Sequence, residues 1–257
     1  MRGTDRDAGL RDADRGVSET VGFVLVFALI ATTIAVTFTV GLGGLEDAQL
    51  AERDNNVERA FDVLHDNFND ISRDGVPSRA TELQLGGGRL SFDRDSAFRL
   101  NDTGTGTEFS EGGSLTYYGA GDTRIVYENG AVFRMQGDDG VMVREPDLLV
   151  GETVVYSLYG LTGPIDSVSG DRTALVVGER TERNVPVDDR AGGENVTLSI
   201  NSSQATVWER YYRDLAEEHD QISVTTEVPA DLRVTFVADE YDRFVAHRSV
   251  ARVTFSD

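Results

Sequence analysis

The sequence predicts an α+β protein, in which a long N-terminal helix, transmembrane and then amphipathic, precedes a mostly antiparallel, sandwich-like β-rich head with one inserted helix. Three observations predict this class. Residues 20–45 carry no charge, residues 57–71 repeat apolar side chains at helical spacing, and residues 81–255 contain many β-branched or aromatic runs separated by turn residues. The rest of the 257-residue chain has room for one sizeable domain.

The uncharged stretch is the first element. It is longer than the roughly 20 residues that cross a bilayer core and than the roughly 7–15 residues of a secretory signal core. We therefore expect a permanent membrane span; cleavage beside Gly41, Gly43 and Gly44, with release of the rest, is the alternative. Arginines precede the stretch and acidic residues follow it, so the positive-inside rule places the N-terminus in the cytoplasm and the head outside.

The second element is an amphipathic helix. Its apolar residues follow spacings of four, three, four and three: Val57, Phe61, Leu64, Phe68 and Ile71. Gly75 and Pro77 are expected to end it. This apolar stripe could form a coiled coil with other subunits or dock on the chain's own β domain. Polar Asp54 interrupts the apolar seam that a coiled coil needs, which favours docking.

The head follows. Asn129-Gly130 between two alternating runs predicts a type I′ hairpin, and a turn at Asp138-Asp139-Gly140 extends it to a three-stranded meander through Val143. One helix, residues 204–219, is expected to be capped by Ser202 or Ser203. Ala205, Trp208, Tyr212 and Leu215 share one of its faces, and we expect Trp208 to be a core anchor.

The composition argues against nucleic-acid binding and excludes sites that need cysteine. The chain has 24 Arg, no Lys and 45 acidic residues, for a net charge of −21. Such a surface repels nucleic acid, and in concentrated salt its carboxylates hardly repel one another, so the composition resembles that of proteins from extreme halophiles. There is no Cys for a disulfide or a thiolate site.

No catalytic or metal-binding constellation is recognisable, so we expect neither an enzyme nor a cofactor. The three histidines lack a second ligand at metal-binding spacing, the glycine clusters lack the strand-to-helix context of a phosphate loop, and the paired acids match no EF-hand. These residues are His65, His219 and His247; Gly86–Gly88, Gly104 and Gly106; and Asp138-Asp139 and Asp188-Asp189.

The N-terminus resembles a known signal. A short polar leader ends in Arg15-Gly16, and Val17-Ser18-Glu19-Thr20-Val21-Gly22 opens the apolar run. This resembles the class III signal peptide of archaeal, often haloarchaeal, type IV pilins, although Glu19-Thr20 stands where Pro-Val is commoner. The resemblance implies that a prepilin peptidase cuts between Gly16 and Val17, and that the apolar helix stays on as filament core.

Glu19 is energetically unfavourable in this segment, because a carboxylate at the lipid edge must be hydrated or paired. Cleavage before Val17 creates an α-amine that could neutralise Glu19 of a neighbouring subunit; hydration at the headgroup level is the alternative. The domains expected are then a leader (1–16), a transmembrane or filament-core helix (17–44), an amphipathic stalk helix (45–73) and an extracellular head (74–257).

Further stretches are similar to an uncharacterised group of haloarchaeal pilin-like membrane proteins: residues 55–64, 77–83, the hairpin at 129–134 and 205–212. The resemblance implies a type IV pilin-like cell-surface subunit, and the size of the head favours a minor pilin. It implies as partners the membrane, the prepilin peptidase and other pilin subunits through residues 17–44. The alternative is a permanently anchored surface binding module or adhesin that assembles no filament.

Three N-glycosylation acceptor patterns are present, which matter only in an exported protein. They begin at Asn101, Asn195 and Asn201. Asn101 lies in a loop-like stretch and is the best candidate, while Asn195 and Asn201 bracket a predicted strand. Unmodified surface asparagines are the alternative for each.

Overall fold

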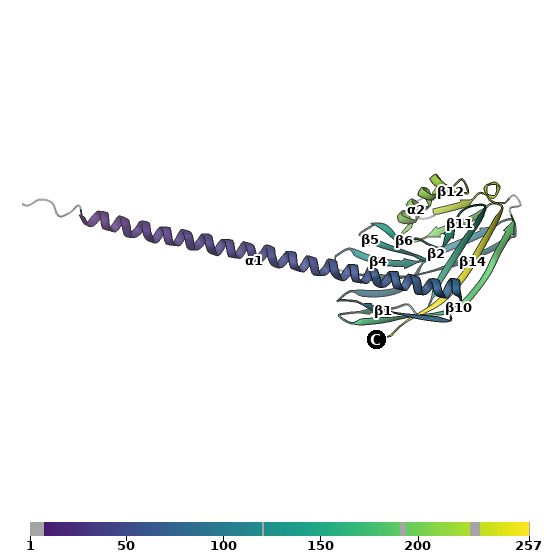
Figure 1. Cartoon of the computed structure of the whole chain (residues 1–257), viewed down its shortest axis with the longest axis horizontal. Coiled ribbons are helices and arrows are strands. Elements are labelled where there is room, and N and C mark those ends of the chain that lie inside the picture. Colours follow the sequence, from purple (N-terminus) through teal and green to yellow (C-terminus); the bar gives the residue numbers. More distant parts are fainter. Residues whose placement is uncertain (1–7, 120, 191–193, 227–231, 257) are drawn as a thin grey trace, which may run out of the picture. The chain divides into compact units, whose positions relative to one another are not determined.

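A computed structural model of the chain describes residues 8–119, 121–190, 194–226 and 232–256 (Figure 1). The side chains of residues 8–20, 46–47 and 189–190 lie outside this description. The chain divides into two compact units, Met1–Glu52 and Arg53–Asp257. Helix α1 (Ala8–Asn69) contributes its first part to one unit and its last turns to the other.

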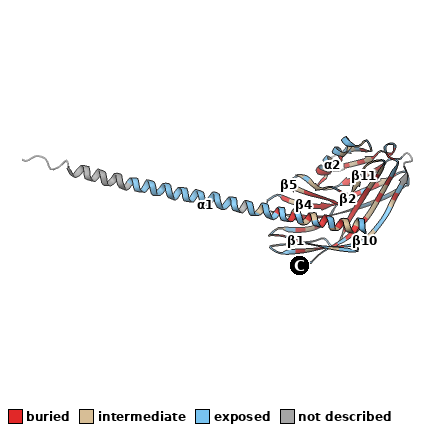
Figure 2. Cartoon of the chain, viewed as in Figure 1, coloured by how far each residue is buried: buried red, intermediate tan, exposed pale blue. Residues whose placement is uncertain are grey.

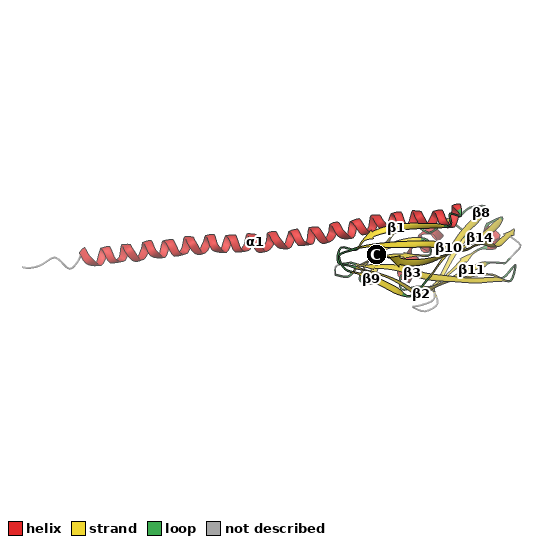
Figure 3. Ribbon diagram, turned by 90° about the horizontal axis from the view of Figure 1, so that it is seen from below, coloured by secondary structure: helices red, strands yellow, loops and turns green. Residues whose placement is uncertain are grey.

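The second unit is a β-rich domain of two sheets. The five-stranded sheet has the order β1 (Ser78–Gln84), β10 (Thr173–Arg190), β14 (Arg243–Ser256), β8 (Thr153–Thr162), β7 (Leu148–Leu149). The nine-stranded sheet has the order β12 (Ile222–Thr226), β13 (Leu232–Phe236), β11 (Val196–Asn201), β2 (Arg89–Asp102), β3 (Thr107–Tyr118), β4 (Thr123–Glu128), β5 (Ala131–Gln136), β6 (Asp139–Arg144), and β9 (Asp166–Ser169) pairs with β2. Figure 3 shows the two sheets from below.

These sheets confirm the predicted fold class of a long N-terminal helix, a β-rich domain and one inserted helix. The described ladders are antiparallel except that of β14 with β8, which is parallel. A parallel pair needs a long crossover connection. Here the chain runs from β8 through β9 to β13 and a 3₁₀ turn (Ala238–Glu240) before it returns in β14, a route that local patterns do not reveal.

The predicted hairpin is confirmed. β4 and β5 pair from Thr123 with Gln136 to Glu128 with Ala131. Asn129 and Gly130 between them have φ angles of 46° and 78°, which are the positive values that a type I′ turn requires at both central residues. β6 then pairs with β5 and completes the meander.

The end of α1 also follows the prediction. After Asn69 the helix widens into one π-helical turn (Asp70–Asp74), and Gly75 adopts a left-handed φ of 71°. Its N–H donates to the Asp70 carbonyl, which satisfies one of the last free acceptors of the helix. A side chain at position 75 would be strained by this φ and would also meet the Arg180 guanidinium.

The described residues of the head form two hydrophobic clusters. One surrounds the last turns of α1 and contains Phe61, Phe68 and Tyr127; the other surrounds α2 (Ala205–Glu218) and contains Phe133 and Trp208. Successive residues of β4 alternate between them, so β4 buries both of its faces. The buried residues of α1 lie in its last turns, where Figure 2 shows them in red.

The predicted cap of α2 is wrong. The N-cap residue is Gln204, and its side chain makes no capping hydrogen bond. Ser202 instead donates its hydroxyl to the Glu128 carboxylate at 2.6 Å, and it accepts the Gln204 N–H at 2.9 Å. The serine therefore ties the start of the helix to β4. Trp208 is fully buried, as predicted for a core anchor.

Candidate functional site

The N-terminal part of α1 is an uncovered apolar surface. From Val21 to Leu45 every described side chain is exposed, including those of Phe23, Leu29 and Phe38 at 71%, 68% and 66% (Figure 2). Thr33 and Thr39 return their hydroxyls to the carbonyls four residues earlier, at 2.8 and 2.9 Å. These two threonines therefore add no unsatisfied hydroxyl to this surface. By length and composition this part of the helix suits a membrane span or an N-terminal signal sequence.

The residues predicted for processing and assembly lie in the same helix. Arg15, Gly16, Val17 and Glu19 are helical in backbone, and their side chains lie outside the described residues. The cleavage after Gly16 and the pairing of Glu19 therefore stay predictions.

The last turns of α1 dock on the head, as the stripe predicted. Phe61, Leu64 and Phe68 are almost completely buried. The Phe68 ring lies 5.0 Å from the Tyr127 ring, nearly perpendicular to it, and 5.8 Å from the Tyr159 ring. Edge-to-face and offset ring pairs of this kind stabilise the folded head beyond the effect of burying the rings. The helix is therefore part of the core of the head.

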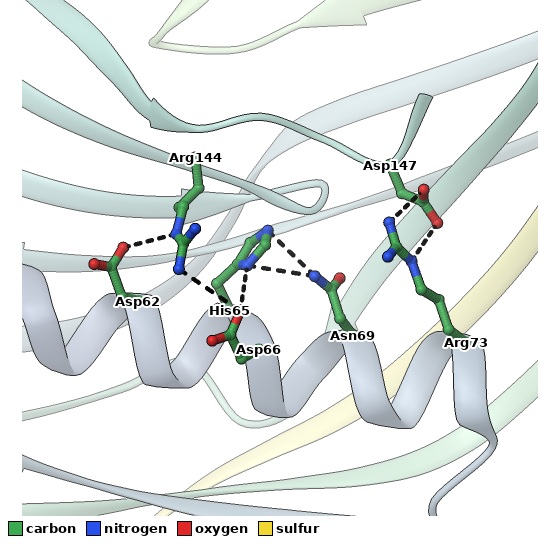
Figure 4. A network of polar contacts seen from close by, with 7 residues as sticks. All are labelled: Asp62, His65, Asp66, Asn69, Arg73, Arg144 and Asp147. Carbon is green, nitrogen blue, oxygen red and sulfur yellow. Dashed lines mark hydrogen bonds and ion pairs between the residues drawn. The ribbon is translucent and has the colours of Figure 1, made fainter. Parts of the chain in front are cut away.

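Polar contacts surround this apolar seam (Figure 4). Arg144 donates to Asp62 at 3.0 Å, and Arg73 donates two hydrogen bonds to Asp147 at 2.8 and 2.5 Å. His65, 8% exposed, lies 3.3 Å from Asn69. The ion pairs are largely solvated, so we expect them to contribute little to the free energy of unfolding. Their main effect is to fix the register of the helix on the strands.

Glu128 carries a buried carboxyl group in the head. Its side chain is 1% exposed, and its Oε1 accepts the Trp208 Nε1–H at 2.9 Å as well as the Ser202 hydroxyl. Burial raises the pKa of the Glu128 carboxyl to about 7, and nearby Asp93 adds to the rise. The carboxyl lines a polar cavity of about 110 Å³ with Asp93 and Ser114.

This carboxyl predicts a pH dependence of stability. As pH rises from 4.5 to about 7, the folded head holds a proton on Glu128 that the unfolded chain has lost, so this group makes the head less stable. The shift corresponds to about 3 kcal/mol. Glu128→Gln keeps an acceptor for Trp208 and cannot ionise, so we expect it to remove this part of the decline.

Urea unfolding at about pH 5 and about pH 8 measures the effect. Glu108→Gln, at an exposed partner of Arg99, is the matched control and should leave the decline unchanged. An equal decline in Glu128→Gln and the unaltered protein would contradict the assignment of the effect to Glu128.

One residue of each acidic pair forms an ion pair within the head. Asp139 pairs with Arg210 at 3.1 Å, and Asp188 pairs with Arg243 at 2.6 Å. Among the described residues no group of three or more His, Asp or Glu could hold a metal ion. Gly86 and Gly87 form a turn with φ angles of 54° and 92°.

Two of the three acceptor asparagines lie on neighbouring strands, and the third directly precedes one of them. Asn101 lies in β2, which extends through Asp102, so the loop predicted there is wrong. Asn195 directly precedes β11 and Asn201 ends it, as predicted. β2 and β11 pair with each other. The sequence patterns marked each asparagine separately, whereas their proximity depends on a strand pairing across about a hundred residues.

Comparisons with known proteins cover most of the chain. Residues 15–250 match a family described as "Family of unknown function (DUF7289)". An uncharacterized protein of Archaeoglobus fulgidus is 28% identical over 80 residues, which are 31% of this chain and 26% of that protein. The chain thus matches about a quarter of the length of that relative. No solved structure matches the chain.

Proposed function

The chain belongs to the family of unknown function DUF7289, and we propose that this protein is a type IV pilin-like, minor-pilin-type structural subunit of the archaeal cell surface, anchored by its N-terminal helix. The observation that carries the proposal is the contrast within α1. Its apolar first part exposes every described side chain from Val21 to Leu45, while its last turns bury a stripe in the head. The matched region starts at Arg15, so it includes both parts.

The exposed part needs an apolar environment. Fourteen large apolar side chains between Val21 and Leu45 are more than half exposed. Burying a side chain of this kind is worth about 1.5–3 kcal/mol, so leaving all of them in water costs tens of kcal/mol. A helix of about 25 residues is about 38 Å long, which exceeds the roughly 30 Å of a bilayer core. Lipid and a bundle of identical helices both meet this need.

The remaining parts of the proposal concern orientation and partners. The arginines of the leader hold the N-terminus in the cytoplasm, and the head lies outside the cell. A prepilin peptidase cuts between Gly16 and Val17, and residues 17–44 then contact lipid or other pilin subunits. The new α-amine pairs with Glu19 of a neighbour. The head is a structural, non-enzymatic module without a cofactor.

The mass of the mature chain tests this function. We expect protein recovered from the membrane of its own cells to begin at Val17, because the peptidase removes the leader and leaves the helix. Gly16→Arg, which makes the residue before the cut large and charged, should leave the leader in place, and Gly22→Ala should be processed normally.

Two other outcomes contradict the proposal in different ways. An intact residue 1 or 2 favours the permanently anchored binding module or adhesin. A chain that begins beyond Gly44 and is released as a soluble molecule excludes anchoring altogether.

A further inference from the structure

Two of the three acceptor patterns are cross-strand partners. In the antiparallel ladder of β2 with β11, Asn101 lies directly opposite Thr197, the hydroxyl residue of the Asn195 pattern. The same register continues past the strand ends. Thr103, the hydroxyl residue of the Asn101 pattern, lies 3.4 Å from the Asn195 carbonyl oxygen and donates to Glu194 at 2.9 Å. Each acceptor asparagine therefore lies beside the hydroxyl residue of the other pattern.

Both patterns are on the outer face of the nine-stranded sheet. Leu100, Leu198 and Ile200 point inward and are fully buried, so the alternating residues Asn101 and Thr197 point outward. The described neighbours on this face are polar: Arg99, Glu108, Ser110, Ser199 and Thr235. A hydrophilic modification at Asn101 or Asn195 therefore lies among polar side chains.

Asn201 lies on the same face at the other end of β11, exposed to solvent. At about 3.3 Å per residue it is about 20 Å from Asn195 along the strand. The opposed pair Asn101 and Thr197 has Cβ atoms about 5 Å apart, and a diagonal neighbour such as Asn195 lies about 7–8 Å away. The face therefore holds two separate positions. One is the corner that Asn101 and Asn195 share, and the other is Asn201.

We infer that the outer face of β2 and β11 is an N-glycosylation face, on which Asn101 and Asn195 form one site that is modified once per molecule and Asn201 forms a second. The inference rests on the proposed export of the head. The co-reactant is a polyprenyl-phosphate-linked oligosaccharide. The asparagine Nδ2 gives up one proton to a base of the transferase and forms a bond to the anomeric carbon. The bond from that carbon to the phosphate oxygen breaks, its electron pair stays on the oxygen, and the lipid phosphate leaves.

Steric exclusion follows from the register. A sugar on Asn101 stands over Thr197, which a transferase must reach in order to recognise Asn195. A sugar on Asn195 likewise stands beside Thr103, the hydroxyl residue for Asn101. The Asn195 amide oxygen also accepts the Ala238 N–H at 2.9 Å, which holds that side chain against the folded head. A head modified after folding therefore carries one sugar at this corner.

Mass spectrometry of the full chain from its own cells tests this. We expect species with at most two glycans, and proteolysis after Leu198 separates Asn195 from Asn201 for assignment. In Asn101→Gln the occupancy of Asn195 should rise by about the fraction that Asn101 carried. Asn201→Gln is the matched control, and it should remove one glycan and leave the corner unchanged.

Molecules with three glycans would overturn the shared corner, and molecules with none at these residues would overturn the glycosylation face. The N-terminus of the same preparation separates this failure from that of the proposed function. Unglycosylated chain that begins at Val17 leaves the pilin-like proposal standing. Glycosylated chain that begins beyond Gly44 leaves the glycosylation face standing without it.

Discussion

Phe68→Ala is expected to destabilise the head by about 3–5 kcal/mol, the usual cost of removing a fully buried phenyl ring. The ring is 1% exposed and packs on Tyr127 and Tyr159. It also lies against Gly178 of β10, where even a methyl group would overlap it. The cavity left by the ring is lined on several sides by the two sheets, which can close on it only partly. Urea unfolding of the full chain in detergent, followed by the fluorescence of Trp208, measures the change.

Val63→Ala is the control for this experiment. Val63 lies on the same helix but is 54% exposed, so its loss should change the free energy of unfolding by less than about 0.5 kcal/mol. If Phe68→Ala costs no more than Val63→Ala, the last turns of α1 are not part of the core of the head.

Local patterns predicted the parts of this fold that depend on nearby residues. The stripe from Val57 to Ile71 is buried at each predicted position, because helical spacing alone decides which side chains share a face. Asn129-Gly130 fixed the hairpin, since few other residue pairs accept two positive φ angles. Trp208 is in the core because a large apolar side chain on the buried face of a helix is rarely left in water.

The features that the patterns missed depend on residues far apart in the chain. Ser202 does not cap α2: its hydroxyl donates to Glu128, some seventy residues earlier in the chain, and its oxygen accepts the Gln204 N–H. Glu128 itself directly precedes the hairpin turn, and nothing in the local sequence marks it as buried. The parallel pairing of β8 with β14 and the register that opposes Asn101 to Thr197 are likewise set by the whole head. Asp54 interrupts the apolar stripe in the sequence, yet its side chain is buried together with that stripe. Burial raises the pKa of the Asp54 carboxyl.

The double substitution Ile30→Asp with Ile34→Asp is expected to abolish membrane retention. Both residues lie near the middle of the apolar segment and are more than half exposed along the helix. On the scale of membrane insertion, one Asp at the centre of a helix costs about 2.5–3.5 kcal/mol, whereas each Leu, Ile, Phe or Val gains only about 0.3–0.6 kcal/mol. The pair therefore costs about 5–7 kcal/mol, which offsets most of what the apolar residues of the segment gain on the same scale. The positions are one helical turn apart, so the two carboxylates also repel each other. Ile30→Leu with Ile34→Leu keeps the apolar character and is the matched control.

The share of the chain that stays with membranes after alkaline and high-salt extraction tests most directly whether the finished protein keeps residues 21–45 in an apolar environment. We predict that the unaltered chain and the double-leucine variant stay in the membrane fraction, and that the double-aspartate variant is recovered from the soluble fraction or degraded. Release of the unaltered chain by the same extraction, with residues 21–45 still attached, would contradict the account.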